Sequence, residues 1–254
     1  MQIYNYLKNT ITGKGAAFLV LIDPDKLHED KLPGFINTCN NAGTDGFLIG
    51  GSLLMHGGID AYIAEIKKHT TLPVIIFPGA ISQVSKNADG ILFISVVSGR
   101  NPEHLIGKHV LSAPLIKQAG IEPLSTGYML VESGSMTTAL YMSGSHPIPR
   151  KKPEIAAATA LAAEYLGMKL IYLEAGSGAD NTVPDEMVKA VSSTCSIPLI
   201  VGGGIKTPAD ARNKVKNGAS IIVIGNFLEN EENWPLIKDF NVAVHVKLSK
   251  ENIA

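Results

Sequence analysis

The residues with the clearest chemical potential form one run in the second half of the chain. Tyr172 and Glu174 lie in an apolar stretch that continues into Gly176-Ser177-Gly178. Alternate residues of a strand share a face, so both polar side chains would point to the same side. A carboxylate among apolar neighbours is costly unless a partner or a function retains it. The run predicts a functional acid beside an anion-binding loop, with one half of a buried ion pair as the alternative for Glu174.

Two later apolar runs end in the same way. Val201 is followed by Gly202-Gly203-Gly204, and Ile224 is followed by Gly225-Asn226. Turns of this kind leave backbone N–H groups open, and these groups bind phosphate with few cations. The glycines could instead serve tight-turn geometry alone. Three such turns on successive strands favour a phosphate site.

Oxygen ligands follow the first two apolar runs. Asp23 comes directly after 17–22, and Ser52 comes after Gly50-Gly51. Mg²⁺ binds through one or two carboxylates plus waters and substrate phosphates, so Asp23 and Ser52 are candidate metal ligands. The alternative is that these side chains cap helices, a role for which Asp25 is better placed than Asp23.

The elements that would position these residues alternate along the chain. Continuous Val, Ile and Leu runs are typical of parallel strands buried on both faces. The expected strands are 17–22, 46–50, 74–77, 91–97, 127–131, 170–173, 199–201 and 221–224. The expected helices are 26–41, 59–68, 102–119, 153–166, 184–193 and 208–217. Eight strands in this length predict a (β/α)8 TIM barrel, whose active site lies at the carboxyl ends of the strands.

Two segments depart from this alternation. No helical pattern is visible between Phe77 and Ile91, so the third crossover is expected to be irregular. The segment 132–152 is a long connection after the fifth strand, and such loops on the catalytic face commonly form a lid or a substrate wall. A solvated connection with an ordinary basic patch at Arg150-Lys151-Lys152 is the alternative.

Composition limits the class of protein. The chain has 254 residues, 45% hydrophobic and 18% charged, with a net charge of -1. Its Lys and Arg residues are scattered, which argues against nucleic-acid binding. No apolar run approaches the roughly 20 residues of a membrane span. Cys39 and Cys195 belong to no CxxC pattern. These features predict a single phosphate-binding barrel domain over 1–254, cytoplasmic, without an integral membrane segment.

At these motifs the sequence resembles the geranylgeranylglyceryl phosphate synthase family. The resemblance runs in order from Asp23 to Asn226. It rests on Asp23-Pro24-Asp25-Lys26, Gly50-Gly51-Ser52, Tyr172-Leu173-Glu174-Ala175-Gly176-Ser177-Gly178, Gly202-Gly203-Gly204-Ile205 and Gly225-Asn226. Val131-Glu132-Ser133-Gly134-Ser135 and Met142-Ser143-Gly144-Ser145 also resemble that family's middle section and suggest its longer subgroup, from archaea and some bacteria.

The resemblance implies a reaction. The family transfers a prenyl group from geranylgeranyl diphosphate to the C3 hydroxyl of sn-glycerol 1-phosphate, which releases diphosphate in ether phospholipid biosynthesis. Asp23 and Ser52 would hold Mg²⁺. The glycerol phosphate would be bound by Tyr172, Leu173, Glu174, Ala175, Gly176, Ser177, Gly178, Gly203, Gly204, Gly225 and Asn226. Glu174 would accept the C3 proton, and Tyr172 would orient the glycerol. Family members assemble as dimers or hexamers, so a homo-oligomer is expected.

Two other readings stay open at this point. Another phosphate-binding barrel, such as a thiamin phosphate synthase or a sugar-phosphate isomerase, could use Asp23 and Glu174 as an acid–base pair. A non-catalytic phosphate- or isoprenoid-binding module could keep the barrel without turnover. A carboxylate inside the barrel beside an anion loop favours an enzyme over a binder.

Overall fold

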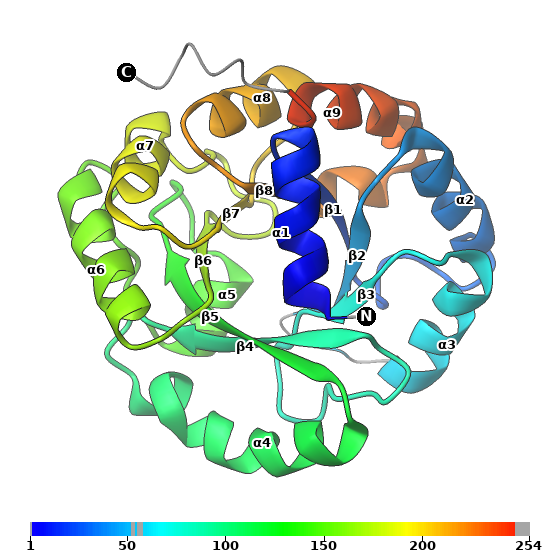
Figure 1. Cartoon of the computed structure of the whole chain (residues 1–254), viewed down its shortest axis with the longest axis horizontal. Coiled ribbons are helices and arrows are strands. Elements are labelled where there is room, and N and C mark those ends of the chain that lie inside the picture. Colours follow the sequence, from blue (N-terminus) through cyan, green and yellow to red (C-terminus); the bar gives the residue numbers. More distant parts are fainter. Residues whose placement is uncertain (1, 52–53, 55–57, 247–254) are drawn as a thin grey trace.

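The computed structural model describes residues 2–51, 54 and 58–246. In this part of the chain, eight parallel strands pair in sequence order, and β8 returns to pair with β1, so the barrel is closed (Figure 1). The strands are β1 (Ala17–Ile22), β2 (Gly46–Ile49), β3 (Val74–Ile76), β4 (Gly90–Val96), β5 (Glu122–Leu130), β6 (Leu170–Glu174), β7 (Leu199–Gly202) and β8 (Ile221–Ile224). The predicted (β/α)8 barrel is confirmed.

Helices surround the barrel and connect most of its strands. The α-helices are α1 (Ile3–Lys14), α2 (Leu32–Ala42), α3 (Ile59–His69), α4 (Lys108–Ala119), α5 (Thr138–Ser143), α6 (Pro153–Tyr165), α7 (Asp185–Thr194), α8 (Pro208–Lys216) and α9 (Ile237–Val244). A π-helical turn η1 (Glu103–Gly107) precedes α4, and the 3-10 helices η2 (Asn226–Glu229) and η3 (Glu231–Leu236) follow β8. None of the helices among the described residues has the length and apolar character that a membrane crossing requires.

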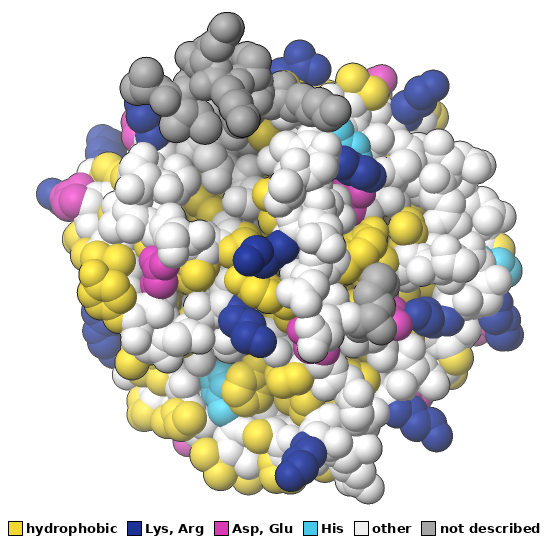
Figure 2. All heavy atoms as spheres, in the orientation of Figure 1, with side chains coloured by type: hydrophobic (Ala, Val, Ile, Leu, Met, Phe, Trp, Pro, Cys, Tyr) yellow, Lys and Arg dark blue, Asp and Glu magenta, His cyan; other side chains and the backbone are white. Residues whose placement is uncertain are grey.

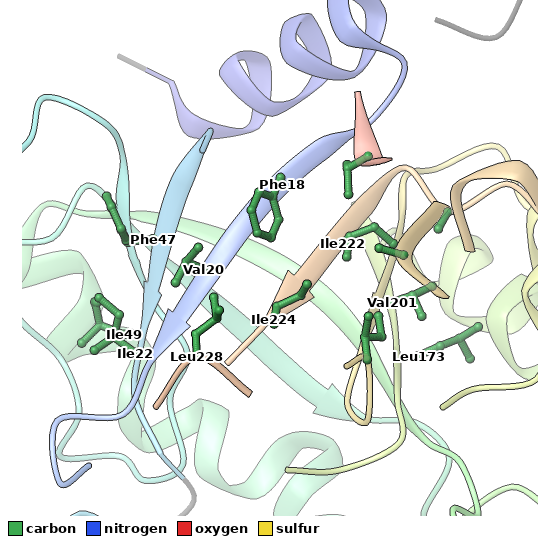
Figure 3. Packing of buried hydrophobic residues seen from close by; sticks show 14 of the residues in the cluster. Phe18, Val20, Ile22, Phe47, Ile49, Leu173, Val201, Ile222, Ile224 and Leu228 are labelled. Atoms are coloured by element: carbon green, nitrogen blue, oxygen red, sulfur yellow. The ribbon is translucent and has the colours of Figure 1, made fainter. Parts of the chain in front are cut away.

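The strands carry two separate apolar cores because successive side chains point to opposite faces. Leu19, Leu48 and Ile200 belong to the core inside the barrel. Phe18, Val20 and their counterparts on other strands belong to the core between the barrel and the outer helices (Figure 3). Strands buried on both faces explain why the sequence shows continuous rather than alternating apolar runs.

Helix α1 closes the amino-terminal end of the barrel and lies across the barrel in Figure 1. Its buried residues Ile3 and Leu7 join the inner core. Two backbone N–H groups of its first turn donate to the carboxylate of Glu122. This helix is not among those expected from the sequence, although Ile3, Leu7 and Ile11 recur at helical spacing. Because α1 covers the amino-terminal end of the barrel, a ligand would have to enter at the carboxyl ends of the strands.

The third crossover is irregular, as predicted. Residues 77–89 connect β3 to β4 by turns without a helix. Two buried polar side chains hold the connection. The amide of Gln83 bonds to Gly79 N and to Gly51 O, and Ser85 Oγ donates to Asp60. The connection therefore packs against the end of β2 and against α3.

Two other predicted segments differ in detail. Helix α2 begins at Leu32 rather than Lys26, and its N-cap position is Lys31, so neither Asp23 nor Asp25 caps it. The Asp23 carboxylate instead accepts the Asp25 N–H at 3.0 Å, and this turn occupies the expected first helical residues.

The long segment after β5 contains α5, whose residues Thr138 and Met142 line the pocket described below. Part of the long segment therefore forms a wall of this pocket.

Candidate active site

A pocket of about 480 Å³ opens at the carboxyl ends of the strands. Polar and glycine residues from β1, β6, β7 and β8 line one part, and apolar residues from the β3–β4 connection, β4 and α4 line another. The first set is Asp23, Lys26, Glu174, Ser177, Gly178, Gly203, Gly204, Gly225, Asn226 and Glu229. The pocket is thus suited to a ligand with an anionic head and an apolar body.

Glu174 is the buried acid of the polar part. It ends β6, it points inward with Tyr172, and its side chain is 5% exposed. Burial raises its pKa to about 7. The Gly176 N–H, which donates to Oε1 at 2.6 Å, and the Tyr172 hydroxyl oppose part of this rise. A carboxyl group with a pKa near neutrality can accept a proton from a bound hydroxyl. No salt-bridge partner for Glu174 occurs among the described residues, so the ion-pair alternative is not supported.

Tyr172 lies inside the barrel beneath Glu174, next to two other aromatic rings. Its ring stacks on Phe77 at 5.4 Å between centroids and contacts Tyr128 at 5.3 Å. Its hydroxyl is buried and makes no well-formed hydrogen bond among the described residues, but it lies close enough to the Glu174 carboxylate to lower the pKa of that group. Buried hydroxyl groups normally have partners, so this one is available to a ligand in the pocket. The three rings also present π faces that attract positive charge.

The glycine turns meet around this acid. A Cβ atom built on Gly203 would lie 2.4 Å from Glu174 Oε1 and 2.6 Å from Gly176 N. The backbone φ angles of Gly176, Gly178, Gly203 and Gly204 are +104°, +72°, +83° and +70°. Only glycine adopts such angles without strain and allows this approach.

The same turns expose backbone donors. Within the described chain, the N–H groups of Ser177, Gly178, Gly203, Gly204 and Gly225 make no backbone hydrogen bond. The turns after β7 and β8, where barrels of this class commonly bind phosphate, supply three of them. The side chain of Asn226 lies beside Gly178, 3.9 Å from a Cβ built there. Together the turns form an anion-binding cradle next to Glu174.

Asp23 lies at the same end of the barrel, after β1. Burial raises the pKa of its carboxyl group, although the Asp25 N–H and Lys26 favour the ionised form. A Cβ built on Gly51 would lie 2.9 Å from Asp23 Oδ2, so the end of β2 passes directly beside this carboxylate. Ser52, the other expected metal ligand, lies outside the described residues. No group of three or more His, Cys, Asp or Glu residues that could hold a metal occurs in the described ranges.

Two charged residues of the pocket were not predicted from the sequence. Glu229 accepts a hydrogen bond from Asn226 Nδ2 at 2.8 Å, and burial raises its pKa. Lys26 lowers the pKa of both Glu229 and Asp23. Glu229 lies in η2, a short helix without a periodic pattern, so no sequence signal marks it. Lys26 belongs to a recognised motif, but its spacing alone gives it no role.

The apolar part of the pocket follows the outer face of β4. Ile91 and Phe93 belong to this face, and Ile116 of α4 and Val84 of the helix-free connection line the same space. His109 of α4 packs edge-on against Phe93 at 4.5 Å between ring centroids. This groove was not located from the sequence, because its walls come from the irregular connection and from α4.

Two predicted binding residues point elsewhere. Leu173 and Ala175 are buried in the core between barrel and outer helices and do not line the pocket. Gly176 is covered by Thr137, which a Cβ at Gly176 would approach to 2.3 Å. Alternation along β6 explains this outcome, because neighbours of the inward Tyr172 and Glu174 must face outward. Any contact of Leu173 and Ala175 with a ligand would be limited to their backbone.

Comparison with known proteins identifies the family. The model of the PcrB family matches residues 9–243. The chain belongs to the PcrB family. A relative from Chitinophaga pinensis, named geranylgeranylglyceryl phosphate synthase, is 45% identical over 244 residues, which cover 96% of each protein. A protein of the same name from Pyrococcus abyssi is 42% identical over 230 residues, 90% of each. The resemblance seen in the sequence is confirmed.

Solved structures agree with this membership in the PcrB family. A crystal structure of (S)-3-O-geranylgeranylglyceryl phosphate synthase from Thermoplasma acidophilum, in complex with sn-glycerol-1-phosphate, superposes with a TM-score of 0.89. It is 32% identical and covers 96% of this chain and 99% of that one. Thiamine phosphate pyrophosphorylase from Pyrococcus furiosus reaches a TM-score of 0.60 at 13% identity, a likeness that shows the fold alone.

Proposed function

We propose that this chain is a prenyltransferase that joins the prenyl group of geranylgeranyl diphosphate to the C3 hydroxyl of sn-glycerol 1-phosphate. The observation that carries the proposal is the position of Glu174. This buried acid, with a pKa of about 7, lies between a cradle of backbone donors and an apolar groove. A base in this position can take a proton from the hydroxyl of a phosphorylated acceptor while that hydroxyl attacks an apolar donor. The names of the relatives agree with this assignment.

The glycerol phosphate would occupy the cradle. Open N–H groups of Gly178, Gly203, Gly204 and Gly225 would hold its phosphate, as backbone donors commonly do in barrels of this type. The phosphate would then hold the glycerol hydroxyls near Glu174 and Tyr172. The Tyr172 hydroxyl would bond to one of them and orient the C3 hydroxyl.

The diphosphate of the donor would lie near Asp23 and Lys26. Mg²⁺ commonly binds through one or two carboxylates and completes its shell with water and substrate phosphates, and Asp23 suits this mode. Asp23, with Ser52 as the second expected ligand, would hold the ion. Bound there, Mg²⁺ would neutralise the charge that develops on the leaving diphosphate.

The prenyl chain would extend from the diphosphate into the apolar groove. Phe77, Phe93, Ile91 and Ile116 line it, and the crossover without a helix lets it run along the outer face of β4. Burial of isoprenoid carbons against these side chains would favour binding by about 0.8 kcal/mol for each methylene. This contribution would bring the C1 carbon of the prenyl group next to the cradle.

The reaction takes place at the C3 oxygen of the glycerol. The C3 oxygen of the glycerol forms a bond to C1 of the prenyl group, and the bond from C1 to the diphosphate oxygen breaks. Diphosphate leaves with that electron pair, and the proton of the C3 hydroxyl passes to Glu174. The faces of Tyr172, Phe77 and Tyr128 would stabilise positive charge on the allylic carbons.

A product assay tests the proposal. The purified chain, Mg²⁺, labelled geranylgeranyl diphosphate and sn-glycerol 1-phosphate should give a lipid-soluble phosphoether and free diphosphate. No such product, with turnover of a sugar phosphate or formation of thiamin phosphate instead, would support the alternative barrel enzymes. Binding of both substrates without turnover would support a binding module.

We also propose that the chain works as a homo-oligomer, a dimer or a hexamer, built from one barrel domain over residues 1–254. All described strands belong to the one closed barrel. Large apolar side chains are exposed on η1 and α4, including Val110 at 66% and Leu111 at 60%. Figure 2 shows hydrophobic side chains at the lower edge, where Figure 1 places α4. Light scattering of Leu111→Glu should report smaller particles than the unaltered chain.

A further inference from the structure

The buried amide of Gln83 connects the wall of the apolar groove to the backbone beside Asp23, where the diphosphate is proposed to bind. Gln83 lies in the helix-free β3–β4 connection and is 4% exposed. Its Oε1 accepts the Gly79 N–H at 2.8 Å, and its Nε2 donates to the Gly51 carbonyl at 3.2 Å. Both ends of the amide are used, so its orientation is determined.

The partner of this amide is itself packed against Asp23. A Cβ on Gly51 would lie 2.9 Å from Asp23 Oδ2, and a Cβ on Gly50 would lie 2.0 Å from the Phe77 carbonyl oxygen. The backbone at the end of β2 is thus confined between β3 and the carboxylate. Asp23 Oδ1 is held on its other side by the Asp25 N–H. The position of the carboxylate depends on the position of Gly51.

We propose that Gln83 is a positioning residue for the diphosphate end of the site, because it holds Gly51 against the Asp23 carboxylate. This inference rests on the proposed function for its substrate. Gln83 touches neither substrate in this assignment. It acts through the backbone of β2, and it ties the apolar groove wall, which includes Phe77 and Val84, to the group that faces the diphosphate.

Ser85 provides a matched control in the same connection. It is also buried, at 1% exposed, and its hydroxyl donates to Asp60 of α3. Ser85→Ala removes a polar contact between the connection and α3 that does not involve Gly51. The test variant is Gln83→Met, which removes both hydrogen bonds of the amide. If residues 77–89 were merely loosened, Ser85→Ala and Gln83→Met would weaken substrate binding alike. If Gln83 positions Asp23, only Gln83→Met would weaken diphosphate binding.

The test combines a binding readout with a kinetic one. Calorimetric titration of inorganic diphosphate in the presence of Mg²⁺ should show about tenfold weaker binding for Gln83→Met, in line with the loss of a group that supports a ligand. The KM for geranylgeranyl diphosphate should rise by a similar factor, while the KM for sn-glycerol 1-phosphate stays within about twofold. Ser85→Ala should leave all three values unchanged.

A second variant keeps the test valid if Gln83→Met does not fold. Gln83→Asn keeps a neutral amide but is one methylene shorter, so it cannot hold both Gly79 and Gly51, and it should show the same split between the two substrates. Unchanged diphosphate affinity in both variants, or an equal loss in Ser85→Ala, would overturn the inference. The titration needs no turnover, so failure of the proposed reaction is recognised separately by the product assay on the unaltered chain.

Discussion

At the scale of single residues, the site combines two groups that folding alone does not favour. Glu174 is a carboxyl group in an apolar interior, and Tyr172 has a hydroxyl without a well-formed hydrogen bond among the described residues. Both choices cost stability in the absence of a ligand. Sites of function are where such costs are retained.

The Tyr172 hydroxyl offers a direct test at this scale. Tyr172→Phe removes no well-formed hydrogen bond of the described fold, only a hydroxyl that favours the ionised form of Glu174. Its free energy of unfolding should therefore fall by no more than about 0.5 kcal/mol, less than the value of a well-formed hydrogen bond. The KM for sn-glycerol 1-phosphate should rise roughly three- to tenfold, the value of one neutral hydrogen bond. Urea denaturation and steady-state kinetics measure the two quantities.

Tyr6 serves as the control for that variant. Its hydroxyl donates to the Asp45 carbonyl at 2.8 Å near the closed end of the barrel. Tyr6→Phe should lower stability by about 1 kcal/mol and leave both KM values unchanged. The opposite pattern, with Tyr172→Phe less stable and fully active, would remove the Tyr172 hydroxyl from substrate binding.

At the scale of elements, two reasons for glycine in the turns can be tested separately: a left-handed backbone and a close approach of neighbouring atoms. Gly203→Ala places a Cβ against Glu174 Oε1, whereas Gly167 has a similar φ of +86° and nothing within 4 Å of its Cβ position. Gly167→Ala should lower stability by about 1–2 kcal/mol for the left-handed backbone. Gly203→Ala should lower it by more, because its Cβ would also collide with the backbone N of Gly176. Only Gly203→Ala should abolish product formation, because it displaces the acid. Equal activity losses in both variants would assign the effect to backbone strain.

The sequence predicts the strands well and the groove poorly, for physical reasons. Strand β1 and strand β8 have the predicted limits because burial on both faces requires unbroken apolar runs. Strand β5 begins at Glu122, five residues before its apolar run, since pairing with β4 extends it through Pro123 and polar residues. The inward direction of Glu174 follows from strand alternation. The groove depends on tertiary placement of 77–89 and α4, which no local pattern encodes.

At the scale of the whole molecule, a polar network holds the closed end of the barrel. The buried carboxylate of Asp45 accepts hydrogen bonds from Lys14, from His245 after α9 and from the Phe18 N–H. Burial alone would raise the pKa of Asp45, but these hydrogen bonds outweigh burial and lower it below its usual value. The network joins both ends of the described chain to β1.

This network predicts a pH dependence of stability. A carboxyl group whose pKa is lower in the folded state stabilises the fold above its unfolded pKa of about 3.9, and this stability is lost as the pH falls through the folded value. Asp45→Asn should therefore be less stable than the unaltered chain at pH 7, and the difference should shrink at pH 3. Urea denaturation at both pH values measures it. A difference that is constant with pH would contradict the ionic role of Asp45.

Glu174→Gln shows whether Glu174 takes the proton from the glycerol hydroxyl. The variant keeps the shape of the side chain and loses the base, so the turnover rate should fall by about 100-fold or more. Affinity for sn-glycerol 1-phosphate, measured by calorimetry, should stay within a few fold. In the unaltered chain the rate should rise as the pH passes about 7, where the Glu174 carboxyl group ionises. A variant that keeps its rate within tenfold, or that loses affinity as much as rate, would contradict this role for Glu174.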